Sequence, residues 1–389
     1  MKKIIIISFT DLKNDPRVNR QIRHLSKRFA VTAIGLKDPE IENVIFVKIE
    51  LNYAASLVKK LKEKSLLLLR QFDRYFDTIF GWQAADSLKQ LVDLVIANDV
   101  ESLPLAFRLS HNTNIPVICD CHEYAPLEFA HQFKWRLLHK PYNGFLCKKY
   151  LPRCRHVFTV SEGIAQAYFE NYNVKPTVIT NACDFVDLAP SDCREDKIRL
   201  IQHGSAQPNR KIEKMIEVMK YTAPRFHLTL MLVPGYQGYI DDLKEKYRDM
   251  KNVTFVPPVL MAEITETLNQ YDVGLYMLEP ANFNNKMALP NKLFEFIQSR
   301  LALAIGPSPE MARIVKKYDC GIVCDAFLSK KMADVLNRLT IENIRYYKQQ
   351  SHRFARELSA VPNMKHLDAV VDQVLQKKLA TDLHRQTQD

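Results

Sequence analysis

Long hydrophobic runs are absent from the sequence, and glycine is scarce. Only 10 of the 389 residues are glycine. The longest apolar runs, such as Ile4–Ile7 and Leu301–Ile305, are far shorter than the roughly 18 residues of a membrane-spanning helix. An apolar share of 47% and a charged share of 25% exclude collagen-like, coiled-coil and disordered chains. The sequence therefore predicts a soluble globular protein whose glycine-rich phosphate loops are short or absent.

A secretory signal and a metal-binding cysteine pattern are also missing. Lys2 and Lys3 precede an apolar run, but this run is too short for a signal peptide and no cleavage site follows it. In such a chain the eight cysteines are expected to be free thiols. Residues 119–122 contain two cysteines and a histidine, but their alternation fits the end of a strand, and no second cluster has zinc spacing. We expect a cytoplasmic protein without a metal site.

Acidic residues are fewer than basic ones. Lysine and arginine total 55 and aspartate and glutamate 44, which gives a net charge of +11. This excess predicts a polyanionic partner. Residues 131–155 contain seven basic residues, no acidic residue and several aromatic ones, and residues 59–74 add six basic residues. Both stretches favour contact with an anionic membrane surface, the alternative being solvated lysines on helices that pack into the core. No nucleic-acid-binding module accompanies the charge, so nucleic acid is not expected as a partner.

Short apolar runs alternate with helical stretches along the chain. Strands are expected at 4–9, 30–36, 43–47, 92–97, 116–121, 157–160 and 177–180, and then at 199–203, 227–233, 253–256, 273–277, 302–305 and 321–323. Nearly continuous apolar strands are typical of parallel sheets that are buried on both faces. The acid-rich stretch Asn181–Asp196 interrupts the alternation and is interpreted as a linker. The pattern predicts an α/β protein with doubly wound domains at 1–185 and 196–340. Helices at 341–377 close the chain, and we expect them to pack back toward the first domain.

Residues 289–295 hold the most informative candidate site. Pro290 and Asn291 predict a helix start, whose first turn offers unpaired backbone N–H groups to an anion. Lys292 would reinforce this anion site. Glu295, one turn further along, could accept two hydrogen bonds from a vicinal diol such as ribose. The alternative is a surface helix with a solvated glutamate.

A second candidate site follows the expected strand 199–203. His203–Ser205 is predicted to form a turn, and a helix is predicted to start within 209–213. Gly204 would permit close approach of the backbone to a ligand. Arg210 could bind a diphosphate with two hydrogen bonds, and Lys211 would add charge. The alternative is an ordinary strand, loop and helix with exposed basic residues.

Polar residues also follow two strands of the first domain. His122 and Glu123 leave a buried strand at the edge where ligands bind, which suits sugar contact or proton handling. Asp99 follows the preceding strand and is expected to point into the same space. The alternatives are a structural histidine and an aspartate that caps the next helix.

Together these segments resemble the GT-B glycosyltransferases of family 4 over nearly the whole chain. The segments that carry the resemblance are 14–25, 98–99, 120–123, 159–162, 178–181, 203–210, 271–274 and 290–295. The resemblance implies two Rossmann-like domains that face an interdomain cleft. It implies a nucleoside diphosphate sugar on the C-terminal domain and a saccharide or lipid-linked acceptor on the N-terminal domain. It also implies transfer with retention of configuration, without a metal or other cofactor.

The resemblance assigns roles to individual residues. Glu295 would bind the ribose, Arg210 the diphosphate and His122 the donor sugar, and these three are the catalytic candidates. Further donor contacts are expected from Gly204, Ser205, Lys211, Pro257, Leu289, Pro290, Asn291 and Lys292. Pro257 belongs to 256–258, which would lie beside the base. Acceptor or cleft contacts are expected from Asp11, Arg17, Asp99 and Glu123.

The predicted function is transfer of a hexosyl unit from a nucleoside diphosphate sugar, by a cytoplasmic enzyme at the inner face of the membrane. Two alternatives stay open. One is a sugar-nucleotide epimerase with the same fold, and the other is a non-catalytic donor-binding or scaffold subunit. The second alternative is favoured by two departures from the family pattern: Met287 occupies the position of the first of two glutamates, and Ser205 that of an arginine.

Overall fold

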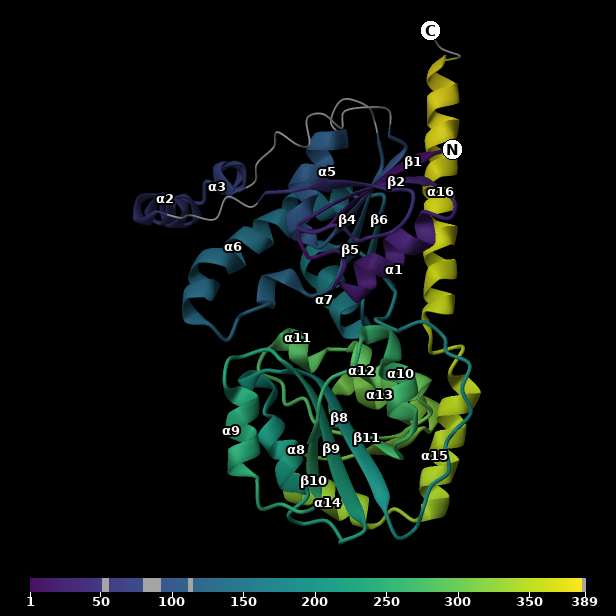
Figure 1. Ribbon diagram of the computed structural model, residues 1–389. Helices are drawn as coiled ribbons and strands as arrows, with labels where there is room; N and C mark the ends of the chain where they lie inside the picture. The colour runs from purple at the N-terminus through teal and green to yellow at the C-terminus, as the bar shows by residue number, and fades with distance from the viewer. Residues whose placement is uncertain (51–55, 80–91, 111–114, 387–389) are drawn as a thin grey trace. The chain divides into compact units, whose positions relative to one another are not determined.

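The computed structural model describes residues 1–50, 56–79, 92–110 and 115–386 (Figure 1). The chain divides into two compact units. Unit 1 comprises Met1–Thr180, Asn282–Asn284 and Met364–Asp389, and unit 2 comprises Asn181–Ala281 and Asn285–Asn363. The chain therefore begins and ends in the same unit.

Unit 1 contains a seven-stranded parallel sheet with the strand order β3-β2-β1-β4-β5-β6-β7. Its strands are β1 (Lys3–Ile7), β2 (Ala30–Gly35), β3 (Val44–Lys48), β4 (Leu94–Asn98), β5 (Val117–Cys121), β6 (His156–Thr159) and β7 (Thr177–Val178). Ile4 of β1 pairs with Val31 on one side and with Leu94 on the other, so the strand order reverses at β1. Such a reversal opens a crevice at the carboxyl ends of the strands, where doubly wound sheets bind ligands.

Helices cover this sheet. They are α1 (Pro16–Leu25), α2 (Leu57–Leu68), α3 (Phe72–Ile79), α5 (Leu103–Ser110), α6 (Phe133–Tyr150), α7 (Glu162–Tyr172) and α16 (Ala360–Gln386), with 3-10 turns at Val100–Ser102, Ala125–Leu127 and Leu151–Arg153. Helix α1 begins at Pro16 because the carboxylate of Asp15 accepts hydrogen bonds from two amides of its first turn. Helix α16 lies beside α1 (Figure 1), and its Asp368 accepts hydrogen bonds from Arg28 at 2.6 Å and pairs with His24 at 2.9 Å.

Unit 2 contains a six-stranded parallel sheet with the strand order β10-β9-β8-β11-β12-β13. Its strands are β8 (Ile198–Ala206), β9 (Phe226–Pro234), β10 (Val253–Val256), β11 (Val273–Tyr276), β12 (Ala302–Ile305) and β13 (Gly321–Val323). Its helices are α8 (Ile212–Val218), α9 (Tyr239–Lys246), α10 (Ile264–Asn269), α11 (Phe283–Lys286), α12 (Asn291–Gln298), α13 (Pro309–Tyr318), α14 (Ser329–Asn337) and α15 (Ile341–Phe354). Short 3-10 turns lie at Pro208–Arg210 and Met261–Glu263. The strands predicted at 253–256, 302–305 and 321–323 have these same bounds in the structure.

One prediction about local structure is wrong. His203–Ser205 is part of β8 rather than a turn, because β8 stays paired with β9 as far as Ala206. The helices predicted at 341–377 are present as α15 and α16, which are separated at 355–359.

The stretch Asn181–Asp196 has no helix or strand, as predicted for a linker. Arg300, which is 1% exposed, holds it in place by donating hydrogen bonds to the carbonyl oxygens of Val186 at 2.6 Å and Leu188 at 3.1 Å. Within the described ranges, no helix combines the length and apolarity needed to cross a membrane.

Candidate functional site

Helix α12 packs directly against the sheet of unit 2, because the strand residue at the contact is a glycine. Gly274 lies in β11, and a Cβ atom on it would be 2.5 Å from the ring of Phe296. Any larger residue would therefore push α12 away from the sheet. Pro290 precedes α12 in an extended conformation, with φ −73° and ψ 153°, and Asn291 starts the helix as predicted. This packing fixes the first turn of α12 and the side chains that it carries.

Lys292 is buried at the start of α12. Its Nζ donates a hydrogen bond to Oε1 of Gln202 at 3.2 Å and lies 4.2 Å from the ring centroid of Tyr276, the last residue of β11. Gly204 has a φ of +100°, and a Cβ on it would lie 3.4 Å from Cε of Lys292. Burial lowers the pKa of Lys292 well below its usual range, and the Arg210 guanidinium lowers this pKa further. Part of the cost of burying this lysine is offset by its contacts with Gln202 and Tyr276.

Glu295 lies one turn further along α12, beside a buried histidine. Its Oε2 is 3.3 Å from Nε2 of His203, without the geometry of a hydrogen bond. Burial lowers the pKa of His203 well below its usual value, and the charge of Lys292 acts in the same direction. In the part of the chain that the structure describes, the Nε2 atoms of His203 and Gln202 are buried without a hydrogen-bond partner. Such atoms are rare in folded proteins, and a bound water, an ion or a polar ligand would supply the missing partner.

Arg210 ends the 3-10 turn that follows β8, and it is half-buried. Burial raises the pKa of Tyr276, and a hydrogen bond with Arg210 opposes this rise, so the two side chains are neighbours. Lys211 behaves differently from the prediction. Its Nζ lies 2.8 Å from Oε2 of Glu279, which also binds Lys214 at 2.6 Å. This geometry pairs the charge of Lys211 with a carboxylate and does not supply it to the site.

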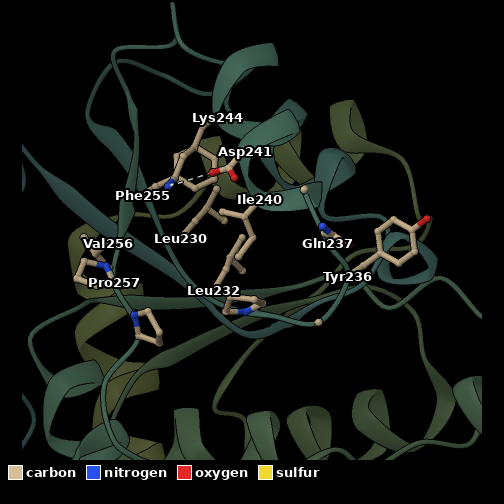
Figure 2. Close-up of a pocket in the computed structure, with 14 residues that line it drawn as sticks. Leu230, Leu232, Tyr236, Gln237, Ile240, Asp241, Lys244, Phe255, Val256 and Pro257 are labelled. Atoms are coloured by element: carbon tan, nitrogen blue, oxygen red, sulfur yellow. Dashed lines mark ion pairs between the residues drawn. The ribbon is translucent and has the colours of Figure 1, made fainter.

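A cavity of about 690 Å³ lies at the carboxyl ends of β9 and β10. Figure 2 shows Leu230, Leu232 and Ile240 on its apolar wall, near Phe255. Its rim includes residues 256–258, which were expected beside a base, and hence Pro257. Asp241 and Lys244 of α9 pair across its rim at 3.8 Å. The cavity has the size of a small-molecule site and an apolar wall suited to a flat ring.

The remaining predicted donor residues have different surroundings. Ser205 is half-buried in β8. Leu289 is 1% exposed and belongs to the apolar core, and its carbonyl oxygen accepts a hydrogen bond from Asn181 at 3.4 Å. Its side chain is therefore not available to a ligand. Pro290 and Asn291 are half-buried at the start of α12.

The structure thus brings Gly204, Arg210, Lys292 and Glu295 together in one part of unit 2. It adds three residues that the predicted list lacks: Gln202, His203 and Tyr276. A signal for the first two was present in the sequence, because two polar residues directly follow the apolar pair Leu200 and Ile201 in β8. A tyrosine that ends an apolar strand gives a weaker signal.

In unit 1, Arg17 and Asp120 form a buried ion pair. Nε and Nη2 of Arg17 donate to Asp120 at 2.9 and 2.7 Å, and Nη1 donates to the carbonyl oxygens of Ile179 and Thr180 at 2.8 and 3.2 Å. Burial acts to raise the pKa of Asp120, but the Arg17 charge outweighs it and the pKa lies below its usual range. This geometry assigns Arg17 a structural role, which replaces the predicted contact with an acceptor.

His122 lies at the carboxyl end of β5, between two polar side chains. Its Nδ1 is 3.3 Å from Oδ2 of Asp99, and its Nε2 is 3.2 Å from Oδ1 of Asn98. The main-chain N–H of His122 donates to the other oxygen of Asp99 at 2.8 Å. Asp99 has a φ of +62° and does not cap the 3-10 turn that follows it, so the capping alternative is wrong. Asp99 instead fixes the orientation of the histidine.

Two further acceptor candidates flank this cluster. Asp11 follows β1 and binds Lys37 at 2.7 Å, and this hydrogen bond lowers the pKa of Asp11. Glu123 is exposed directly after His122. Among the described residues, no group of three or more His, Cys, Asp or Glu side chains is arranged to hold a metal ion.

Comparisons with known proteins match one enzyme family over part of the chain. Residues 18–187 match the model of Glycosyltransferase Family 4. The O-antigen chain mannosyltransferase RfbU of Salmonella typhimurium is 27% identical over 149 residues, which are 37% of this chain and 40% of that protein. The alignment therefore spans less than half of this curated relative.

Solved structures match the fold over nearly the whole chain. HepE from Anabaena, in complex with UDP, has 14% identity and a TM-score of 0.68, with 96% of this chain and 100% of that chain covered. Sucrose-phosphate synthase from Thermosynechococcus elongatus has 13% identity and a TM-score of 0.72, with 97% and 100% covered. Likeness at this level of identity shows the fold, here two parallel-sheet α/β domains of the GT-B type. The family match over residues 18–187 and the fold of the whole chain together support a GT-B glycosyltransferase of family 4 type.

Proposed function

We propose that the protein transfers a hexosyl unit from a nucleoside diphosphate sugar to a saccharide or lipid-linked acceptor, and that unit 2 binds the donor. The observation that carries this proposal is the convergence of Arg210, Lys292 and Glu295 around Gly204. Two cations and the first turn of an eight-residue helix suit a diphosphate. A carboxylate one turn away suits the two hydroxyls of a ribose.

The base would occupy the cavity beside residues 256–258. Its apolar wall of Leu230, Leu232 and Ile240 would bury one face of the ring. Solved relatives support a nucleotide ligand, because HepE is described in complex with UDP-glucose. The unpartnered Nε2 atoms of Gln202 and His203 would gain acceptors from the donor.

The proposed chemistry depends on stabilising the leaving group. The bond between the anomeric carbon and the diphosphate oxygen breaks, the acceptor oxygen forms the new bond, and the proton of the acceptor hydroxyl passes to the departing diphosphate. Negative charge develops on the diphosphate, where Arg210 and Lys292 would stabilise it. One such contact contributes about 2 to 4 kcal/mol to a transition state. We propose that transfer retains the anomeric configuration and uses no metal, because these cations supply the required charge.

Unit 1 would receive the acceptor and contact the donor sugar. His122 is oriented by Asp99 and Asn98 at the carboxyl end of β5, and Glu123 is exposed beside it. RfbU is named as a transferase of O-antigen chains, which supports a saccharide chain as the acceptor. A cytoplasmic location with peripheral contact at an anionic membrane is part of this proposal.

The test is donor binding and turnover. Thermal shifts with a panel of nucleoside diphosphates and their sugars identify the base and the sugar, because a ligand that binds the folded state stabilises it. Arg210→Ala and Glu295→Ala should each reduce turnover of the identified donor at least tenfold. Lys211→Ala is the control and should change turnover little, because Glu279 pairs with its charge. Normal turnover in both site variants would refute the site assignment, and epimer formation without an acceptor would identify an epimerase.

A non-catalytic donor-binding subunit is the second candidate function. Met287 favours it, because a methionine stands close before α12 where the family pattern has a carboxylate. Tight nucleotide binding without transfer or hydrolysis across an acceptor panel would support this function. Met287→Glu would then be expected to raise turnover.

A further inference from the structure

Helix α2 of unit 1 directs apolar side chains toward solvent. Val58 is 76% exposed, Leu61 57% and Leu68 59%, and Leu69, which ends the helix, is 67% exposed. A surface helix of a globular protein normally buries its apolar stripe. Three large apolar side chains on the outer face of one twelve-residue helix, with a fourth at its C-cap, are therefore unusual.

The orientation of α2 is fixed by its opposite face. Leu66 and Leu67 are buried, and Lys59 and Glu63 are half-buried on the same side. Helix α3 follows with four buried residues, Phe72, Tyr75, Phe76 and Ile79, and α2 packs against both α3 and α6. Figure 1 shows these three helices together at one side of unit 1. Helix α2 therefore has tertiary contacts, and its leucines point outward although the helix is packed on its other face.

Lysines border the outward apolar row. Leu61 and Leu68 are seven residues apart and lie on one line along the helix. At 100° per residue, Lys60 and Lys64 lie on one side of this line and Lys62 on the other. All three lysines are exposed. Apolar side chains between rows of cations are the pattern of a helix that lies in the interface of an anionic membrane.

The first half of α6 has the same character. Phe133 is 69% exposed and Leu137 56%, and Lys134, Arg136 and Lys140 are exposed between and beside them. The second half does not. Tyr142, Leu146 and Tyr150 are buried there. Lys149 pairs with Asp73 at 2.7 Å, and the Arg153 guanidinium lies 4.3 Å above the ring of Phe107. Of the predicted membrane-contacting stretch 131–155, only the part up to about residue 140 therefore remains suited to a membrane.

We propose that the outer face of α2, together with the first half of α6, inserts into the interface of an anionic lipid bilayer. The leucines would enter the acyl boundary and the lysines would contact lipid phosphates. The inference deepens the proposed function and rests on it in one respect, since a lipid-linked acceptor lies in such a membrane. A second copy of the chain is the poorer occupant, because a symmetric contact would place the lysines of both copies against one another.

The primary test is co-sedimentation of the full chain with phosphatidylcholine vesicles that contain no anionic lipid or about one third phosphatidylglycerol. We expect binding to the anionic vesicles at low salt and its loss at high salt. Leu61→Ser with Leu68→Ser should weaken binding at least tenfold, and so should glutamine at Lys60, Lys62 and Lys64. Because these side chains are exposed, the variants should fold normally, which circular dichroism and thermal melting verify.

Matched controls come from unit 2. Leu328 is 57% exposed, as Leu61 is, and Lys251, Lys330 and Lys331 are exposed. Leu328→Ser and glutamine at these three lysines should leave vesicle binding unchanged. Leu61→Trp provides a second measurement, because insertion shifts its emission to shorter wavelength and adsorption by charge alone does not.

Three results would overturn the proposal: failure of the wild type to bind anionic vesicles, normal binding by the leucine variant, or a dimer that the leucine variant abolishes. The α2 variants should keep normal thermal shifts with the donor. The two proposals can fail separately. If the wild type binds anionic vesicles but no donor, the proposed function is contradicted and this inference stands.

Discussion

Lys292 lies against Gly204. A Cβ atom at residue 204 would be 3.4 Å from Cε of the lysine. A helix and a strand meet here, and the missing side chain leaves the backbone of β8 close to a buried cation. An anion that reaches this backbone therefore also reaches Lys292. Gly204 also adopts a φ of +100°, which side chains rarely allow, so its conformation favours glycine independently of this contact.

Gly204→Ala should lower both stability and diphosphate affinity. The positive φ makes the substitution cost about 1 to 3 kcal/mol in the free energy of unfolding. Gly144→Ala is the control, because Gly144 lies inside α6 and a Cβ there would have ordinary contact with Tyr172, at 3.6 Å. It should stabilise the protein by up to about 1 kcal/mol. Urea denaturation measures both values, and equal effects of the two substitutions would contradict this explanation of Gly204.

Donor binding should take up protons through Lys292. Burial lowers the pKa of Lys292 in the free protein, and a diphosphate would favour the charged form and raise this pKa again. Affinity should therefore fall as pH rises through the pKa of the free protein. Calorimetry in buffers of different ionisation enthalpy counts the protons, at a pH well above the phosphate pKa of about 6. Lys292→Met should abolish the uptake, and Lys292→Arg should bind without it. Unchanged uptake in Lys292→Met would place the titrating group elsewhere.

Glu295 should recognise the ribose hydroxyls and nothing else on the nucleotide. Glu295→Gln should weaken binding of the nucleoside diphosphate by about 10- to 100-fold, the range of one or two hydrogen bonds to a charged group. For the wild type, removal of both ribose hydroxyls in the 2′,3′-dideoxy nucleotide should weaken binding as much as Glu295→Gln does. For the variant, the same removal should weaken binding little further. Calorimetric titration of both proteins with both ligands gives the four affinities of a double-mutant cycle. Additive losses would show that Glu295 does not contact the ribose.

Breaking the ion pair between Arg17 and Asp120 should lower the free energy of unfolding of unit 1. Arg17→Met leaves a buried carboxylate without its cation and should cost about 3 to 5 kcal/mol. Arg28→Met breaks the half-exposed pairs with Asp368 and Asp372 and should cost less than about 1 kcal/mol. Because the pKa of Asp120 is lowered, its contribution is full above the unfolded-state pKa of about 3.9 and is lost as pH falls through the folded-state pKa. Urea denaturation from pH 7 downward checks both the magnitude and the sign.

The strands and the start of α12 could be predicted from the sequence because their signals are local. A strand that is buried on both faces is a continuous apolar run, as in Ile4–Ile7 and Ala302–Ile305. Pro290 and Asn291 mark the helix start in the same way. The residues around Gly204 could also be named, because ligands of doubly wound proteins bind where parallel strands end.

The partners of charged side chains could not be predicted, since they depend on contacts between distant residues. Lys211 pairs with Glu279, and Arg17 pairs with Asp120, 103 residues away. The sequence left two alternatives for the apolar face of α2, because the periodicity of Leu61 and Leu68 is the same whether that face meets the core or the solvent. The extension of β8 through Gly204 depends on its partner β9, which continues to Pro234.

The return of the chain into unit 1 has a consequence for gene fragments and nonsense mutations. Leu367 and Val371 of α16 share a core with Ile4 and Ile22, so residues far apart in the sequence form one core. A stop codon just before Met364 would leave unit 2 nearly intact. It would remove from unit 1 the part of α16 that packs into its core. During synthesis on the ribosome, unit 1 therefore lacks this part of its core until α16 has been made.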